Sequence, residues 1–204
     1  MSKGESTRQH LMELAKAEFL EKGYNDASVR NIAKTAGLTT GAIFRYFPDK
    51  ESIFAALVSP VAEEMLAMYR AGNEKGFDFL SEGRPQEMWG ISDEVIVSLI
   101  DYIFSNKEVF ALLINCSAGS PYEHFLDEMI AEEEKQSIAY LQGMRERGFH
   151  CADISDADIH VLLSAQYYAI FEIIRHDTPK DEALARVRLI ADFFRPGWQK
   201  IYGG

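Results

Sequence analysis

The 204-residue sequence predicts an all-α fold with two domains. Three observations support this prediction: apolar residues recur every three or four positions along most of the chain, capping residues stand where these patterns begin, and no segment shows the alternation and tight turns of a β-hairpin. We expect a three-helix head with a helix-turn-helix at residues 1–50. A connecting helix would join it to an all-α domain at residues 51–204.

The first helix is expected over residues 8–22, after a polar segment at residues 1–7 that we expect to fray. Its apolar stripe consists of Leu11, Leu14, Ala15 and Phe19, which are spaced as one face of a helix. This stripe predicts packing against the next two helices rather than binding of a ligand.

Residues 27–50 carry the pattern of a helix-turn-helix. Gly37 follows the first short apolar pattern, where the chain must turn through a left-handed conformation, and Thr39 is a candidate N-cap of the second helix. Each helix has an apolar face, and the two faces would bury each other at a steep crossing angle. The first face is Ile32, Ala33 and Ala36, and the second is Leu38, Ile43 and Phe47.

The opposite face of the second short helix is polar and small. It consists of Thr39, Thr40, Gly41, Ala42, Arg45 and Tyr46. Because glycine and alanine let the backbone approach another surface closely, this face suits the major groove of DNA.

Together with its flanks, the segment GYNDASVRNIAKTAGLTTGAIFRYFPDKESIF resembles the N-terminal DNA-binding domain of the tetracycline-repressor (TetR) family. The resemblance begins upstream with Leu11, Ala15, Phe19, Gly23 and Tyr24, where that family's first helix has its packing residues and its final glycine-aromatic pair. It implies a transcriptional repressor that binds a palindromic operator in double-stranded DNA as a homodimer. A small hydrophobic or aromatic effector would release it.

The resemblance also assigns DNA contacts by position. It places the polar face of the second short helix against bases or the adjacent backbone, and it adds Ser28, Arg30 and Lys50, of which Lys50 would hold a phosphate. Thr40, Phe44, Arg45 and Tyr46 depart from the family's common pattern, so no operator sequence is transferred. Arg45 would either read guanine O6 and N7 in the major groove or bind a phosphate.

Charge is distributed unevenly along the chain. Residues 1–50 contain 8 Lys and Arg against 6 Asp and Glu, whereas the remaining residues contain 13 against 26. DNA would repel the acidic domain, so only the head is expected to approach it. Cys116 and Cys151 make no disulfide framework, and no apolar stretch predicts a membrane span or a secretion signal. We therefore expect a cytoplasmic protein without membrane contact.

The connecting helix is expected to open at residue 49 or 50, directly after Pro48, and to run to about residue 70. A kink is expected at Pro60 because proline removes one hydrogen bond of the helical ladder. Residues 72–85 contain three glycines and predict a loop or a weak helix.

Further helices are expected over residues 93–105, 108–117, 120–148 and 155–176, and a last one from residue 178 to the Pro196-Gly197 pair. The starts of the last three carry capping signals, namely Ser120 with Pro121 and Glu123, Ser155 with Asp158, and Thr178 with Asp181.

The last two helices carry more apolar surface than one domain needs, which indicates a partner. In the family that the chain resembles, these helices pair with their copies in a four-helix dimer interface. The expected interface residues are Ala165, Tyr168, Ala169, Ile173, Leu189 and Phe193. The alternative is that these residues fill the core of their own domain.

The middle helices are rich in aromatic side chains, which favours a cavity for an aromatic or long-chain ligand. The candidate lining residues are Trp89, Phe104, Phe110, Cys116, Tyr122, Phe125, Met129, Tyr140, Tyr167 and Phe171. The alternative is ordinary core packing. A domain without a cavity would favour a DNA-binding regulator that a protein partner controls.

An enzyme is the remaining alternative, with Cys116 as nucleophile and His124 as base. Cysteine in an apolar helical pattern is more often a core residue. His124 and Glu128 have the spacing of two ligands on one helix face, but no third or fourth metal ligand joins them. We therefore expect no catalytic residues, no metal and no cofactor.

Overall fold

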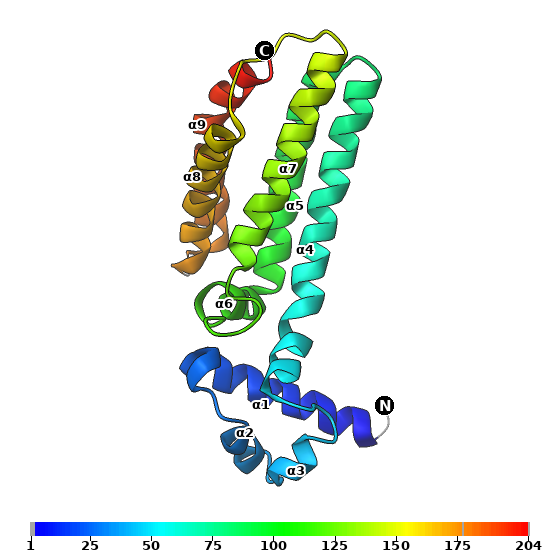
Figure 1. Ribbon diagram of the computed structural model, residues 1–204. Helices are drawn as coiled ribbons and strands as arrows, with labels where there is room; N and C mark the ends of the chain where they lie inside the picture. Colours follow the sequence, from blue (N-terminus) through cyan, green and yellow to red (C-terminus); the bar gives the residue numbers. More distant parts are fainter. Residues whose placement is uncertain (1–2, 177, 204) are drawn as a thin grey trace. The chain divides into compact units, whose positions relative to one another are not determined.

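The structure is a computed structural model that describes residues 3–176 and 178–203, except the side chains of residue 3 and residues 91–93. Within these residues the chain forms helices and turns without a β-strand, which confirms the predicted fold class (Figure 1). The helices form two compact units. The N-terminal unit is Met1–Glu64 with Asn106–Phe125, and the C-terminal unit is Met65–Ser105 with Leu126–Gly204. These packing units extend past residue 50, and the functional division at that residue stays a prediction.

In the N-terminal unit, α1 (Lys3–Asp26) packs against α2 (Val29–Thr35) and α6 (Lys107–Asn115), and α2 packs against α3 (Thr40–Ile43) (Figure 1). Helix α1 extends beyond the predicted residues 8–22 at both ends. Residues 1–2 of the expected frayed segment lie outside the described part of the chain.

An aromatic cluster forms the core of the N-terminal unit. The ring of Phe54 meets the rings of Phe19 and Tyr24 edge-on, with centroid distances of 5.0 Å and 5.1 Å. The backbone N–H of Tyr24 donates a 2.7 Å hydrogen bond to the carbonyl of Cys116. Gly23, with φ of 72°, interrupts the helical backbone just before this contact, at a dihedral that glycine adopts without steric cost.

Helix α4 (Lys50–Ser81) begins where the sequence predicts and continues through Pro60. For residues 72–85 we expected a loop or a weak helix; the loop alternative was wrong as far as Ser81, where α4 ends. Two of the glycines that suggested it lie at packing contacts instead: a side-chain carbon at Gly72 would lie 3.1 Å from Val95, and one at Gly76 would lie 3.9 Å from the Tyr140 ring. Glycine therefore lets neighbouring side chains approach α4 closely.

Helix α4 is long and apolar enough to cross a membrane by length and composition alone. Its apolar side chains are nevertheless used in protein cores. Those with at most 2% exposure are Ile53, Phe54, Val58, Met65 and Leu80. This burial is typical of a core helix.

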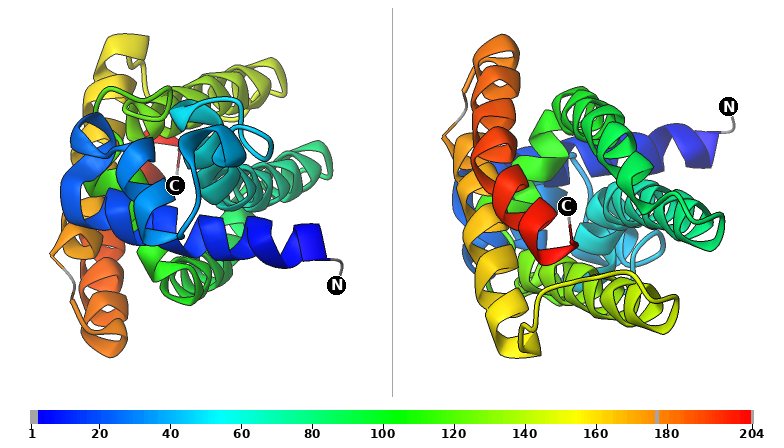
Figure 2. Two further views of the ribbon diagram at one scale, coloured as in Figure 1. Left: turned by 90° about the horizontal axis from the view of Figure 1, so that it is seen from below. Right: turned by 90° about the horizontal axis from the view of Figure 1, so that it is seen from above.

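The C-terminal unit also contains the 3₁₀ helix η1 (Pro85–Glu87), α5 (Met88–Ser105), α7 (Phe125–Glu146), α8 (Asp156–Arg175) and α9 (Lys180–Ile201). Helix α9 packs along α8 and against α5 (Figure 2). Ser155 caps α8 as predicted, since its hydroxyl oxygen accepts the Asp158 N–H at 3.2 Å.

Two predicted helix limits were wrong. Helix α7 starts at Phe125 rather than near residue 121, because Ser120 accepts the Tyr122 N–H and Glu123 accepts the Gly119 N–H within a tight turn. Helix α9 continues past Pro196 to Ile201, where the buried Trp198 packs and donates its indole N–H to Gln166 at 2.6 Å. In the second case tertiary packing outweighs the local helix-breaking signal.

Candidate nucleic-acid interface and cavity

A tight turn joins α2 to α3. Gly37 has φ of 67°, and the N–H of Leu38 donates to the Ala33 carbonyl at 2.9 Å, the hydrogen bond of a Schellman motif. The Thr39 hydroxyl oxygen caps α3 by accepting the Ala42 N–H at 3.2 Å. These features give the predicted helix-turn-helix, although α3 has only four residues before the chain turns again at residues 44–46.

Glu18 holds the start of α2 against α1. Its carboxylate accepts hydrogen bonds from the Asn31 side chain at 2.5 Å, the Ser28 N–H at 3.2 Å and the Lys22 ammonium at 3.1 Å. Burial raises the pKa of this carboxyl group, but the three donors together outweigh burial and hold the pKa below its ordinary value. No periodicity or motif in the sequence points to this residue.

The ammonium group of Lys50 forms hydrogen bonds within the protein. It donates to the carbonyls of Tyr24 at 2.6 Å, Asn25 at 3.0 Å and Ala27 at 3.3 Å, and it lies 4.5 Å from the centroid of the Tyr24 ring. The predicted phosphate contact is not supported by this geometry. In the structure Lys50 ties the end of α1 to the start of α4.

The other predicted DNA-contacting residues lie on or beside the helix-turn-helix. Those that are exposed are Ser28, Arg30, Thr39, Gly41 and Arg45, and those that are half-buried are Thr40, Ala42 and Tyr46. Two apolar residues add to the exposed surface: Phe44 is 48% exposed, and Leu38, which was expected in the core, is 36% exposed. Leu38 belongs to the turn, so its side chain is not enclosed between the two helices.

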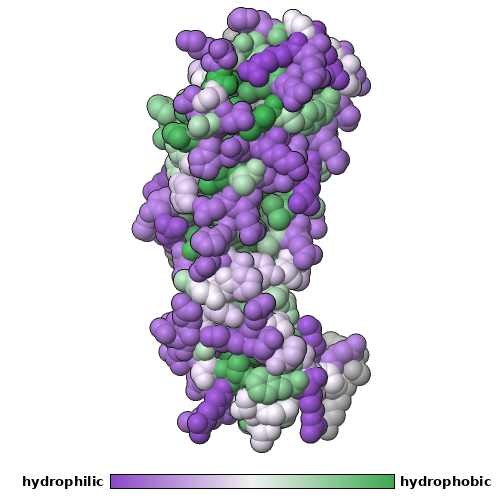
Figure 3. Space-filling model, viewed as in Figure 1, coloured by the Kyte–Doolittle hydropathy of each residue, from purple (hydrophilic) through white to green (hydrophobic). Residues whose placement is uncertain are grey.

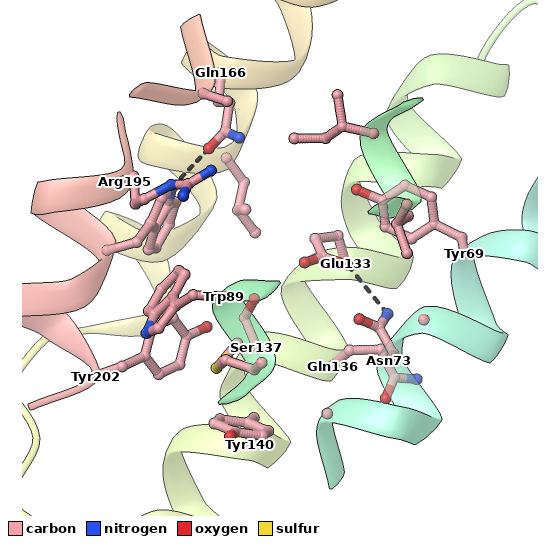
Figure 4. A pocket seen from close by; sticks show the side chains of 18 of the residues that line it. Tyr69, Asn73, Trp89, Glu133, Gln136, Ser137, Tyr140, Gln166, Arg195 and Tyr202 are labelled. Atoms are coloured by element: carbon pink, nitrogen blue, oxygen red, sulfur yellow. Dashed lines mark hydrogen bonds between the residues drawn. The ribbon is translucent and has the colours of Figure 1, made fainter. Parts of the chain in front are cut away.

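The C-terminal unit contains a cavity of about 200 Å³ between α4, α5, α7, α8 and α9 (Figure 4). Three of the predicted lining residues line it: Trp89, Tyr140 and Tyr167. The other seven do not line this cavity; they are Phe104, Phe110, Cys116, Tyr122, Phe125, Met129 and Phe171. Periodicity identifies an apolar helix face without saying which neighbour that face meets.

Several polar and aromatic residues that line the cavity were not predicted from the sequence. They are Tyr69, Asn73 and Phe77 on α4, Glu133, Gln136 and Ser137 on α7, Gln166 on α8, Arg195 and Trp198 on α9, and Tyr202 directly after α9. The α4 residues lie on or next to the segment that was expected to be a loop. Glu133 lies within a run of three glutamates that reads as a solvated helix face.

Helices α8 and α9 carry exposed apolar side chains. Leu189 is 70% exposed, Phe193 is 78% exposed, and Tyr168 is 47% exposed while its hydroxyl donates to Asp127 at 2.6 Å. Among the other predicted interface residues, Ala165 is exposed, and Ala169 and Ile173 are half-buried. Val161, which the sequence analysis did not include, is 63% exposed. Elsewhere the drawn face of the molecule is largely hydrophilic (Figure 3).

The geometry does not support the enzyme and metal alternatives. Burial raises the pKa of the Cys116 thiol, which reduces its thiolate fraction. His124 lies in the turn before α7 rather than on a helix face with Glu128, and its ring contacts Glu123 at 3.2 Å. No group of three or more potential metal ligands occurs among the residues that the structure describes.

Residues 11–57 match the sequence model of one family, described as bacterial regulatory proteins, tetR family. This range contains the complete helix-turn-helix and both residues that hold it, Glu18 and Lys50. Residues 11–57 therefore form a domain similar to those of the tetR family.

The curated relatives match the same region. The chain is 45% identical over 58 residues to the HTH-type transcriptional repressor AcnR of Corynebacterium diphtheriae, which is 28% of this chain and 30% of that protein. It is 40% identical over 53 residues to the HTH-type transcriptional regulator AcrR of Shigella flexneri, 26% of this chain and 25% of that protein. The matched region thus spans under a third of these relatives' own length.

Solved structures resemble the whole fold. A transcriptional regulator from Aquifex aeolicus superposes with a TM-score of 0.59 at 17% identity, covering 92% of this chain and 99% of that one. NalD, the secondary repressor of the MexAB-OprM multidrug efflux pump in Pseudomonas aeruginosa, superposes with a TM-score of 0.54 at 17% identity, covering 99% and 98%. At this identity the likeness shows the fold alone.

Proposed function

We propose that the chain is a transcriptional regulator that represses by binding a palindromic DNA operator as a homodimer, and that a small aromatic effector releases it. The observation that carries this proposal is the helix-turn-helix within the region that matches the tetR family, with Arg30, Thr39 and Arg45 exposed. Curated relatives that match this region are named as transcriptional repressors. The protein would act in the cytoplasm and without catalysis.

The DNA contacts that we propose are Ser28, Arg30, Thr39, Thr40, Gly41, Ala42, Arg45 and Tyr46. Lys50 would support them from within the fold. Residues 1–50 are net basic and the rest of the chain is strongly acidic, so electrostatics favours this end for DNA and disfavours the remainder.

A homodimer would double the short readout of one helix-turn-helix, since a two-fold axis matches a palindrome. The proposed interface is the exposed apolar face of α8 and α9 around Tyr168, Leu189 and Phe193. Contiguous apolar side chains at such exposure are typical of an interaction site.

The effector would act by differential binding. A ligand in the cavity of the C-terminal unit lowers DNA affinity if it binds more tightly to a dimer geometry that fits DNA poorly. The loss of DNA affinity cannot exceed the ligand's preference for that geometry. The existence of a polar and aromatic cavity favours this scheme over control by a protein partner alone.

Selection from a random duplex library with the purified protein tests the DNA assignment. We expect a palindrome, and we expect the affinity for the selected site to fall steeply with salt. Failure to enrich any sequence at several salt concentrations would contradict the proposal. An Arg147→Ala variant is the control. It removes one positive charge at an exposed residue directly after α7 in the C-terminal unit, and it should select the same palindrome.

A further inference from the structure

The cavity of the C-terminal unit contains a carboxyl group that the protein compensates only slightly. Glu133 projects from α7 toward α4, and a single hydrogen bond reaches its carboxylate from the described residues, donated by the side-chain amide of Asn73 at 3.2 Å (Figure 4). A carboxylate in a cavity costs free energy unless a cation or several donors offset the loss of water. The site therefore has unused capacity to bind positive charge.

The two glutamates that flank Glu133 differ from it in this respect. Glu132 pairs with Arg70 at 3.7 Å, and Glu134 contacts the His160 ring at 2.8 Å. Among the described residues of this run, Glu133 is thus the carboxylate without a basic partner, and it is also the one that lines the cavity.

A second polar group in the cavity has no hydrogen-bond partner among the described residues. The hydroxyl of Tyr167 on α8 is buried, the residue being 5% exposed, and no described protein group forms a hydrogen bond with it. Burying an unpaired hydroxyl is unfavourable, and such groups often mark a place that another molecule occupies. Glu133 and Tyr167 line the same cavity from different helices.

Aromatic rings form much of the remaining wall. Trp89 and Tyr202 meet edge-on with centroids 6.0 Å apart, Tyr140 and Tyr202 with centroids 5.5 Å apart, and Tyr69 also lines the cavity. Ring faces of tryptophan and tyrosine attract organic cations and stack on aromatic groups. The one arginine that lines the cavity in the described chain, Arg195 on α9, is drawn apart from Glu133 (Figure 4).

The size of the cavity limits the ligand. Its volume is about 200 Å³, whereas a dry cavity of about 150 Å³ accepts benzene and drug-sized ligands need about 300 Å³ or more. One aromatic ring with a short substituent therefore fills it.

We propose that this cavity binds a small arylalkyl ammonium ion, with the ammonium on the Glu133 carboxylate and the ring among Trp89, Tyr140 and Tyr202. The Tyr167 hydroxyl orients the ligand from α8. This inference rests on the proposed function, because it specifies the chemistry of the effector.

Calorimetric titration of the full chain at pH 8 with three probes tests the inference. The probes are 2-phenylethylammonium, 2-phenylethanol and phenylacetate, which are of similar size and carry a positive, a neutral and a negative terminal group. We expect the ammonium to bind, the alcohol to bind more weakly by a factor of about ten or more, and the carboxylate not to bind. Equal affinity for alcohol and ammonium, or preference for the carboxylate, would overturn the inference.

Two variants assign the roles. Glu133→Gln should weaken 2-phenylethylammonium binding about tenfold and remove its advantage over the alcohol. Tyr167→Phe should weaken binding about threefold to tenfold without reducing thermal stability, because its hydroxyl has no protein partner to lose. Glu128→Gln, altered at an exposed position of the same helix, should bind as the wild type. Unchanged binding in Glu133→Gln would reject the carboxylate's role.

Two measurements together separate this inference from the proposed function: titration of the ligand without DNA, and release of the selected DNA by the same ligand. If 2-phenylethylammonium binds through Glu133 but leaves the complex with the selected DNA intact, the ligand class stands and the effector role fails. If phenylacetate or 2-phenylethanol releases the DNA while the ammonium does not bind, the effector role stands and the cationic ligand is rejected.

Discussion

The side-chain amide of Asn31 in α2 donates a 2.5 Å hydrogen bond to the buried carboxylate of Glu18 in α1. The same carboxylate accepts the Ser28 N–H at the start of α2. Because Ser28 and Arg30 belong to the proposed DNA surface, the orientation of that surface depends on a buried carboxylate outside the proposed contacts. A charged acceptor with three donors fixes this orientation more strongly than apolar contact alone.

Replacing Glu18 should destabilise the N-terminal unit in a pH-dependent way. The pKa of Glu18 is lowered in the folded state, so its contribution is present above the ordinary glutamate pKa and is lost as the pH falls through the folded value. Glu18→Gln should therefore lose about 2 kcal/mol of unfolding free energy at pH 7 and less near pH 3. Urea denaturation across this range measures the difference. Glu21→Gln, exposed on the same helix, is the control and should match the wild type.

Lys50→Met should destabilise the N-terminal unit by about 1–2 kcal/mol, since three carbonyls and the Tyr24 ring lose their cationic partner. Its DNA affinity should fall by a similar factor for all sequences. Thermal unfolding and DNA titration of one preparation measure the two effects together. A weakened complex with unaltered stability would restore the predicted phosphate contact.

Arg45→Ala should relax the preference at one base pair in each half-site of the selected palindrome, at a cost of about 1–3 kcal/mol. The reason is that the exposed Arg45 side chain offers a bidentate donor pair suited to guanine. Repeating the selection with the variant measures the preference position by position. A uniform loss over all sequences, with a smaller dependence on salt, would identify a phosphate contact instead.

Leu189→Glu combined with Phe193→Glu should convert the proposed dimer to a monomer. Each side chain is more than two-thirds exposed in the isolated chain and would contribute about 1.5–3 kcal/mol on burial, whereas a buried carboxylate opposes association. Sedimentation equilibrium measures the mass. Phe44→Glu, which alters an exposed aromatic residue of the N-terminal unit, should leave the mass unchanged. A dimeric double variant would place the interface elsewhere.

Glu133 should make the C-terminal unit less stable as the pH rises from about 4.5 to about 7. Burial raises the pKa of Glu133 to about 7, with a lowering by the Asn73 hydrogen bond and a further rise from the charge of Glu132. The folded state therefore holds a proton that the unfolded chain has released, and stability decreases with pH in this interval. Denaturation of Glu133→Gln should show a flatter pH profile. An identical profile in the variant would contradict the raised pKa.

The sequence alone identified the all-α fold, the helix-turn-helix and the family that residues 11–57 match, because each depends on local order along the chain. Gly37 and the Thr39 cap act through the hydrogen bonds of their own turn, and Ser155 does the same at α8. The sequence did not identify the continuation of α4 past Gly72 or of α9 past Pro196, where contacts with distant helices outweigh local preference.

The tertiary structure decided the roles of Lys50 and Glu133. The carbonyls that accept hydrogen bonds from Lys50 lie 23 to 26 positions earlier in the chain, and the Asn73 amide lies 60 positions before Glu133. No periodicity records such distances, so a lysine that was predicted to meet phosphate proves to bind its own backbone. A glutamate in an apparently solvated run proves to line a cavity. The sequence determines which chemical group a side chain carries, but the packing of separate helices determines which groups it contacts.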